Sequence, residues 1–270
     1  MQWFGWTLVI LCALFALYLW LIAPARRRVD ASALKGWLYA HRGLYDEQTA
    51  PENSMEAFRR AAQAGFGIEL DVQLTRDGRM VVHHDGDTGR VCGQSAVIRE
   101  TDYDRLPLLP DGSRIPLFDD VLALVNGRVP LIVEVKQYGS PSRNAAAALE
   151  HLRAYAGPYC VESFQPIAVR YFKKHAPDVV RGQLATGDGA HRGAVPPGAF
   201  FALKNLLVDC IGRPDFIAYS VGADRGFTVR LVRRWFRPLL AGWTIQSQQE
   251  LDRALKTYDF PIFERFLPKR

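Results

Sequence analysis

The chain contains the octapeptide Gly67-Ile68-Glu69-Leu70-Asp71-Val72-Gln73-Leu74, in which apolar and polar residues alternate. This alternation is typical of a β-strand with two different faces. The carboxylates of Glu69 and Asp71 then project from the same face, roughly 7 Å apart. Two carboxylates this close repel each other unless a cation lies between them or water surrounds them. The octapeptide therefore predicts either a solvated face or a cation site.

A second segment, Leu131–Lys136, repeats the pattern. Val133 and Val135 lie on one face, and Glu134 and Lys136 lie on the other. In an ordinary antiparallel sheet the polar face would simply contact water. In a barrel of parallel strands one face packs on helices and the other points into the barrel, so that polar residues near the strand ends line the active-site mouth.

Strand-like and helix-like segments alternate after residue 37, which predicts an α/β fold: a (β/α)8 TIM barrel. A doubly wound open sheet is the alternative, but no glycine-rich nucleotide loop supports it. Between Val72 and Met80 there is no room for a crossover helix, so we expect the second helix of the barrel to be missing. The predicted strands are Trp37–His41, Ile68–Val72, Met80–His84, Leu131–Lys136, Cys160–Phe164, Val179–Leu184, Phe216–Tyr219 and Leu239–Ile245. The predicted helices are Ser54–Ala64, Phe118–Val125, Ser142–Tyr155, Ile167–Lys174, Phe227–Phe236 and Gln248–Thr257.

Residues 3–25 contain no charged side chain, and a helix of this length would span about 34 Å, enough to cross a bilayer. Arginines follow at 26–28 and no basic residue precedes the segment, so the positive-inside rule predicts a single-pass membrane protein with the domain after the arginines in the cytoplasm. A cleaved signal peptide is the alternative, but the segment is long and lacks a basic start. We expect three parts: a transmembrane helix at 3–25, a basic linker at 26–36 and one domain at 37–270.

The composition of the chain fits a single large domain. Apolar residues make up 49% of the 270 residues, enough for one large core. The net charge of +6 is modest, and no basic stripe interleaved with aromatic residues is present, so we expect no nucleic-acid partner. The cysteines indicate neither a disulfide framework nor a zinc site.

Three carboxylates from two strands would meet at the barrel mouth, at Glu69, Asp71 and Glu134. Without a partner, such burial costs several kcal/mol, against a total stability of roughly 5–15 kcal/mol. A hard divalent cation bound by oxygens removes this conflict, and Mg²⁺ or Ca²⁺ is the natural choice. The pair His41-Arg42 upstream and the run His83-His84-Asp85 downstream add groups suited to metal-assisted work on a phosphate.

Several motifs together resemble the signature of the glycerophosphodiester phosphodiesterase family. They run in order from about residue 38 to 250, and the ordered set is far more specific than any one of them. The motifs are His41-Arg42-Gly43, Pro51-Glu52-Asn53-Ser54, the run from Glu69 to Gly78, Val81-Val82-His83-His84-Asp85, Ile115-Pro116-Leu117, Val133-Glu134-Val135-Lys136, Ser163-Phe164 and Gly242-Trp243-Thr244-Ile245.

The resemblance implies a TIM-barrel enzyme that uses a divalent metal to hydrolyse glycerophosphodiesters to sn-glycerol 3-phosphate and an alcohol. It implies metal ligands at Glu69, Asp71 and Glu134, and an acid–base pair at His41 and His84. His83 points to the opposite face of its strand and is expected to pack or to lie at the surface.

The resemblance also implies that Arg42 and Lys136 contact the phosphate and that Trp243 forms an aromatic wall beside the glycerol. It suggests that the glycerol 2-hydroxyl attacks first, through a cyclic phosphate. Direct attack by water, and the assignment of base and acid to the two histidines, stay open. Gln246 departs from the family pattern, which commonly has Asn there, and the short segment 86–111 leaves no room for a large capping domain.

Two other functions remain as alternatives. A lysophospholipase-D-type activity on lysophospholipids would use the same fold, and the open mouth of a membrane-tethered barrel would suit such substrates. A catalytically inactive membrane scaffold is the third possibility, and the intact acidic and histidine residues argue against it.

Overall fold

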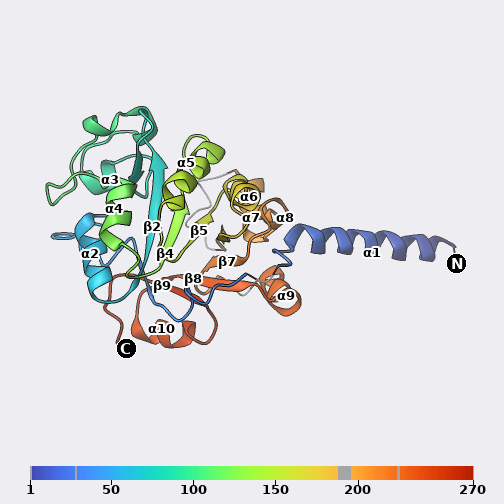
Figure 1. The fold of residues 1–270 in the computed structure, drawn as a ribbon. Helices are drawn as coiled ribbons and strands as arrows, with labels where there is room; N and C mark the ends of the chain where they lie inside the picture. The colour runs from blue at the N-terminus through green and yellow to red at the C-terminus, as the bar shows by residue number, and fades with distance from the viewer. Residues whose placement is uncertain (1, 28, 188–195, 224–225, 270) are drawn as a thin grey trace.

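The computed structural model describes residues 2–27, 29–187, 196–223 and 226–269. Its centre is a closed barrel of parallel strands (Figure 1), in which β1 pairs with both β2 and β9. The TIM barrel predicted from the sequence is therefore confirmed. The barrel strands are β1 (Tyr39–His41), β2 (Gly67–Leu74), β4 (Leu131–Val135), β5 (Tyr159–Ser163), β6 (Val180–Ala185), β7 (Phe216–Ser220), β8 (Leu239–Ile245) and β9 (Phe260–Phe263).

Helices connect the strands and cover the outside of the barrel (Figure 1). The helices in these crossovers are α2 (Met55–Gln63), α4 (Phe118–Val125), α5 (Pro141–Arg153), α6 (Pro166–His175), α7 (Pro197–Lys204), α8 (Asp209–Gly212), α9 (Phe227–Trp235) and α10 (Gln248–Ala254). Five of these helices, α2, α4, α5, α6 and α10, turn apolar side chains toward the strands and contribute to the largest hydrophobic core, whereas α9 packs into a separate apolar cluster.

One predicted barrel strand is wrong. The segment Met80–His84 forms only the short β3 (Met80–Val82), which pairs antiparallel with β2 outside the barrel. A tight turn at Gly78, whose φ is +82°, joins β2 to β3, so the link has no helix, as its length predicts. The eighth barrel strand is β9, which the sequence analysis missed because it is short and contains Pro261.

The connection from β3 to β4 forms a small excursion beside the barrel. It contains α3 (Gly89–Cys92) and two 3₁₀ turns, η1 (Ile98–Glu100) and η2 (Tyr103–Arg105), and it has a small apolar core of its own. The excursion then returns through α4, which supplies the helix of the crossover from β2 to β4. The second helix of the barrel, which the sequence analysis expected to be missing, is therefore present and only displaced along the chain by the excursion. The first residues of the excursion lie beside the carboxyl-terminal half of β2, where the His83 amide donates to the Asp71 carbonyl (2.9 Å).

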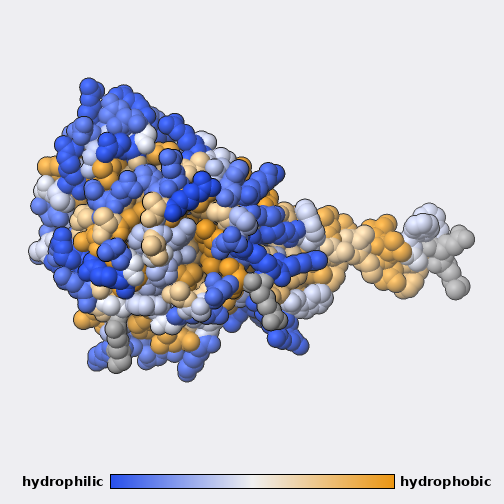
Figure 2. All heavy atoms as spheres, viewed as in Figure 1, coloured by the Kyte–Doolittle hydropathy of each residue, from blue (hydrophilic) through white to orange (hydrophobic). Residues whose placement is uncertain are grey.

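The first helix, α1 (Gln2–Ile22), extends away from the barrel, and its surface is largely apolar (Figures 1 and 2). The part of it from Trp3 to Ile22 is long and apolar enough to cross a membrane, a test that a signal sequence also passes. Its last turns touch the domain: the Phe15 ring packs edge-on against Trp235, with centroids 6.0 Å apart, and Ile22 is fully buried.

The residues that follow α1 are folded against the amino-terminal end of the barrel. The Arg27 guanidinium donates to both carboxylate oxygens of Asp215 (2.9 and 2.6 Å), directly before β7. Ala31 and Leu34 are buried there, and the Tyr39 hydroxyl donates to the Leu34 carbonyl (2.6 Å). This segment thus closes the end of the barrel opposite the strand carboxyl ends.

Candidate functional site

Three carboxylates meet at the carboxyl end of the barrel. β2 and β4 are neighbours with Asp71 directly opposite Glu134, and the alternation of β2 places Glu69 on the same inner face. Oxygens of the three groups lie within 4.8 Å of one another, and all three side chains are buried. The acidic cluster that the sequence predicts is therefore present as a geometric unit, which we call the acidic triad.

Two basic side chains partly neutralise the acidic triad. Lys136 Nζ lies 2.8 Å from Glu134 Oε1 and 3.2 Å from Asp71 Oδ1, and Arg42 Nε lies 3.5 Å from Asp71 Oδ2. Burial favours a protonated Asp71, but Lys136 and other neighbouring cations outweigh it and hold its pKa well below the usual range. Burial and repulsion by Asp71 raise the pKa of Glu69 well above its usual value, and burial raises that of Glu134 to about 7.

The residues of the acidic triad fit a divalent cation. Two basic groups face three carboxylates, and Arg42 is shared with a fourth carboxylate, Glu52, so positive charge is lacking. The donors are all oxygens, which hard cations such as Mg²⁺ and Ca²⁺ prefer. Two oxygens bound to one Ca²⁺ at about 2.3–2.6 Å lie at most about 5 Å apart, so the observed spacing suits a shared ion.

Arg42 is held by an unusual backbone conformation. It follows β1 with φ of 57°, in the left-handed region, and its amide donates to Glu69 Oε2 (3.1 Å). The next residue, Gly43, has φ of 82°, and a Cβ atom there would lie 2.8 Å from the backbone of Ala57. The glycine therefore lets α2 approach closely, which fixes the turn that presents His41 and Arg42 to the acidic triad.

His41 lies between two carboxylates. Its Nδ1 donates to Glu264 Oε2 (2.6 Å), and its Nε2 lies 3.8 Å from Glu69 Oε2. The Tyr45 hydroxyl and the Gln246 amide also donate to the Glu264 carboxylate (3.2 and 2.7 Å). Burial and the charge of Arg42 lower the pKa of His41, while the bond to Glu264 opposes this. Burial favours a protonated Glu264, but the bond to His41 outweighs it and lowers the pKa of Glu264 to about 2.

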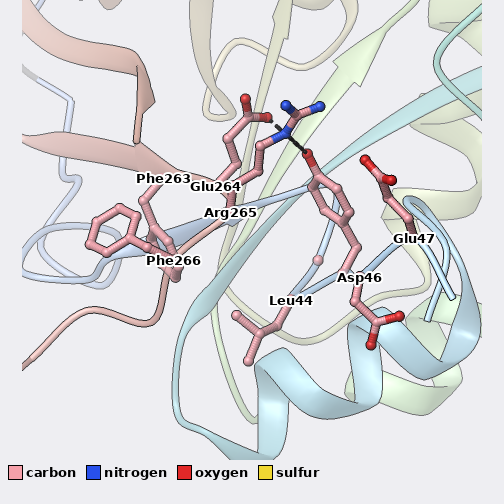
Figure 3. Close-up of a pocket in the computed structure, with 9 residues that line it drawn as sticks. Leu44, Asp46, Glu47, Phe263, Glu264, Arg265 and Phe266 are labelled. Carbon is pink, nitrogen blue, oxygen red and sulfur yellow. Dashed lines mark hydrogen bonds between the residues drawn. The ribbon is translucent and has the colours of Figure 1, made fainter. Parts of the chain in front are cut away.

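Glu264 was not predicted from the sequence. It directly follows β9, the strand that was missed, and no spacing rule links it to His41 across the whole chain. It also borders a rim cavity of about 370 Å³ (Figure 3), in which Arg265 donates to the Tyr45 hydroxyl (3.4 Å, dashed). A signal was available in the sequence: the short apolar run Phe260–Phe263 is followed by an acidic residue, and β2 and β4 also carry acidic residues within apolar runs.

His84 has a partner network of its own. Its Nδ1 donates to Asp85 Oδ1 (2.7 Å), and Arg90 Nε donates to the other oxygen of Asp85 (2.6 Å). Arg90 also pairs with Glu52 (2.6 Å), which in turn accepts from Arg42 (2.7 Å). A chain of alternating charges therefore links the two predicted catalytic segments across the mouth.

The two adjacent histidines have different surroundings. Burial and the charge of Lys136 lower the pKa of His84 to about 4, so that its imidazole is neutral at pH 7. His84 borders the central cavity, whereas His83 is almost fully buried and does not. Gln73 supports this turn, because its amide donates to the carbonyls of His83 and Asp85 (both 2.7 Å).

A cavity of about 250 Å³ opens at this end of the barrel and joins the predicted residues. Asp71 and Lys136 are ion-paired to one another beside its charged wall. The other six predicted site residues border it, and so do Glu162 and Glu264, which were not predicted. The six predicted residues on its wall are His41, Arg42, Glu69, His84, Glu134 and Trp243.

Comparison with known proteins gives one consistent result. The model of the glycerophosphoryl diester phosphodiesterase family matches residues 41–258. A glycerophosphodiester phosphodiesterase of Caldanaerobacter subterraneus is 31% identical over 166 residues, which are 56% of this chain and 67% of that protein.

Solved structures match nearly the whole domain. A glycerophosphodiester phosphodiesterase of Thermotoga maritima is 25% identical, with a TM-score of 0.64, over 88% of this chain and 95% of that one. A phosphodiesterase of Oleispira antarctica, solved in complex with the product sn-glycerol-3-phosphate, is 22% identical, with a TM-score of 0.67, over 87% and 94%.

Proposed function

Because the chain belongs to the glycerophosphoryl diester phosphodiesterase family, we propose that it hydrolyses glycerophosphodiesters to sn-glycerol 3-phosphate and an alcohol. The observation that carries this proposal is the acidic triad beside Arg42 and Lys136 in the barrel mouth. Such a site suits an anionic ester, since a dication and two basic groups stabilise the charge that gathers on phosphate oxygens in the transition state.

Glu69, Asp71 and Glu134 would hold the divalent cation, Mg²⁺ or Ca²⁺. When bound, the ion supplies Lewis-acid stabilisation of the phosphate charge. Arg42 would donate a hydrogen bond to a phosphate oxygen, and its bond to Glu52 fixes the position of its guanidinium group. Lys136 stabilises the ionised forms of Asp71 and Glu134 through its two ion pairs, and it adds positive charge near the phosphate.

The two histidines would divide the proton transfers. His84 has a pKa lowered to about 4, so it is neutral and able to accept the proton of the attacking hydroxyl. The bond of His41 to the Glu264 carboxylate opposes the lowering of the His41 pKa by burial and Arg42, so we assign His41 as the acid that protonates the departing alcohol oxygen. The attacking hydroxyl is either water or the glycerol 2-hydroxyl, and both need the same two transfers.

The test is a panel of glycerophosphodiesters and lysophospholipids, assayed with Mg²⁺ and Ca²⁺ separately. We expect sn-glycerol 3-phosphate from glycerophosphocholine, with activity lost in chelator and restored by the cation. Release of choline and lysophosphatidic acid from lysophosphatidylcholine, without cleavage of glycerophosphocholine, would instead show a lysophospholipase D. No cleavage of any diester with either metal would refute the proposal and favour the inactive scaffold.

We predict that cation affinity rises with pH. Burial raises the pKa of Glu134 to about 7, so below pH 7 a proton occupies the ligand that the cation needs. Affinity should therefore increase between pH 5.5 and 8, by up to about tenfold per pH unit for each proton displaced. Calorimetry in two buffers of different ionisation enthalpy measures both affinity and proton release. An affinity independent of pH, without proton release, would contradict the prediction.

We predict that Glu264→Gln lowers kcat about tenfold to a hundredfold with little change in KM, because the bond of His41 to a charged partner is lost. Glu47→Gln is the matched control, since Glu47 lies on the same rim (Figure 3) but is exposed. Unchanged kcat in Glu264→Gln would show that the carboxylate does not serve His41.

We further propose that residues 3–25 anchor the enzyme in a membrane, with the catalytic domain in the cytoplasm. The apolar helix supports the anchor, and the arginines at 26–28 support the orientation. The full-length protein should resist alkaline extraction from membranes and keep the mass of the uncleaved chain. A mass shortened by cleavage near Ala25 would identify a signal peptide instead.

A further inference from the structure

Glu162 is a buried carboxyl group that the mechanism above does not use. It lies on β5 directly opposite Glu134 of β4, and only 3% of its surface is exposed. Among the described residues, no hydrogen-bond partner reaches its Oε2 atom, although the side chain borders the central cavity. An unpaired polar group at such depth is costly, so a bound molecule that pairs with it gains free energy.

The cavity has two unlike sides. His41, Glu69 and Glu134 lie on the neighbouring strands β1, β2 and β4 and form the charged side, where the phosphate is expected. The other side is contributed by β5, which neighbours β4, and by β6 and β8 and their ends. Its walls are mostly apolar and carry the carboxyl group of Glu162; the other residues are Phe164, Leu184, Trp243 and Thr244.

The side that contains Glu162, Phe164 and Trp243 suits a short carbon chain with a polar end. The rings of Phe164 and Trp243 pack edge to face, with centroids 5.8 Å apart, and offer contact to CH₂ groups. A hydroxyl group suits Glu162 in either protonation state, because a hydroxyl both donates and accepts hydrogen bonds.

We propose that Glu162 binds a free hydroxyl of the substrate's glycerol arm, and that it thereby selects fully deacylated glycerophosphodiesters over lysophospholipids. The inference rests on the proposed function and deepens it. An acyl group replaces one of the two hydroxyls, so an acylated arm leaves Glu162 unpaired and must also fit its chain into a cavity of about 250 Å³. Sites built to pair with a hydroxyl strongly reject analogues that lack it.

The experiment compares kcat/KM for glycerophosphocholine, for its two deoxy analogues that each lack one glycerol hydroxyl, and for a short-chain 1-acyl analogue that stays monomeric. The full-length holoenzyme is assayed as wild type, Glu162→Gln and Glu162→Leu. Asp209→Asn is the matched control, because Asp209 is another fully buried carboxylate without hydrogen-bond partners among the described residues, and it lies in α8, outside the cavity.

We expect wild type to prefer glycerophosphocholine to one deoxy analogue and to the acyl analogue by about a hundredfold or more. In Glu162→Leu this preference should fall at least tenfold, mainly through loss of activity on the hydroxylated substrate. Glu162→Gln, which still hydrogen-bonds, should lie between the two. Asp209→Asn should keep the wild-type preference.

Three results would overturn the inference while leaving the proposed function intact. The first is an equal loss on all substrates in Glu162→Leu. The second is weaker Mg²⁺ or Ca²⁺ binding in Glu162→Gln by calorimetry, which would make Glu162 a metal ligand. The third is a Glu162 effect that vanishes when glycerophosphoglycerol replaces glycerophosphocholine, which would make it a partner of the amine head group. Failure of wild type to cleave any diester would instead refute the proposed function.

Discussion

Replacing Glu69 by glutamine is expected to lower kcat/KM for glycerophosphocholine by about 1,000-fold. The amide keeps the shape of the side chain but removes one negative charge from the acidic triad, so the cation binds poorly. Losing the ion removes several kcal/mol of transition-state stabilisation, and about 4 kcal/mol corresponds to about 1,000-fold in rate. The assay is steady-state hydrolysis at fixed Mg²⁺ or Ca²⁺, with calorimetry of the cation on the same protein.

Glu150→Gln is the matched control, since Glu150 is exposed on α5 and faces away from the site. Glu69→Gln should also be more stable than wild type without metal, because burial and repulsion by Asp71 raise the pKa of Glu69. Full activity with unchanged cation affinity would remove Glu69 from the metal site and undermine the proposed mechanism.

The second large effect is expected for the two histidines, whose alanine variants should each lose about 100- to 10,000-fold in kcat on glycerophosphocholine. A substrate with a nitrophenyl leaving group separates their roles, because that group departs without a proton. His41→Ala should recover most of its activity on the nitrophenyl ester if His41 is the acid. His84→Ala should stay inactive on both substrates if His84 is the base.

His151→Ala serves as the control, because His151 pairs with Asp119 outside the barrel and borders no part of the central cavity. The reverse pattern, with His84→Ala rescued, would exchange the two assignments. Equal rescue of both variants would show that neither histidine acts as the base.

Much of the fold could be predicted from the sequence because parallel barrel strands carry strong local signals. Ile68–Val72 and Leu131–Lys136 alternate clearly, and both form barrel strands. The error at Met80–His84 has a physical cause, since an apolar run of three residues fits an antiparallel hairpin as well as a barrel strand. Whether such a run closes the barrel depends on pairing with residues far away in the chain.

The family and the class of enzyme, a phosphoric diester hydrolase, are confirmed by the match over residues 41–258. The structure brings the predicted site residues together, and their individual roles stay predictions. Glu162 and Glu264 were not singled out from the sequence. Although the apolar run before Glu264 was a signal, only the closed barrel reveals the neighbours of these two residues, Glu134 and His41.

The ion pair between Arg27 and Asp215 fixes the position of α1 relative to the barrel, and so bears on which side of the domain would face a membrane. Soon after α1 the chain packs against the amino-terminal end of the barrel through Arg27 and Asp215. A bilayer around α1 would therefore hold the domain close to the membrane surface. The catalytic mouth opens at the other end of the barrel and would be turned toward the aqueous phase. For the anchored enzyme proposed above, this placement favours water-soluble diesters over lipids of the membrane that holds α1.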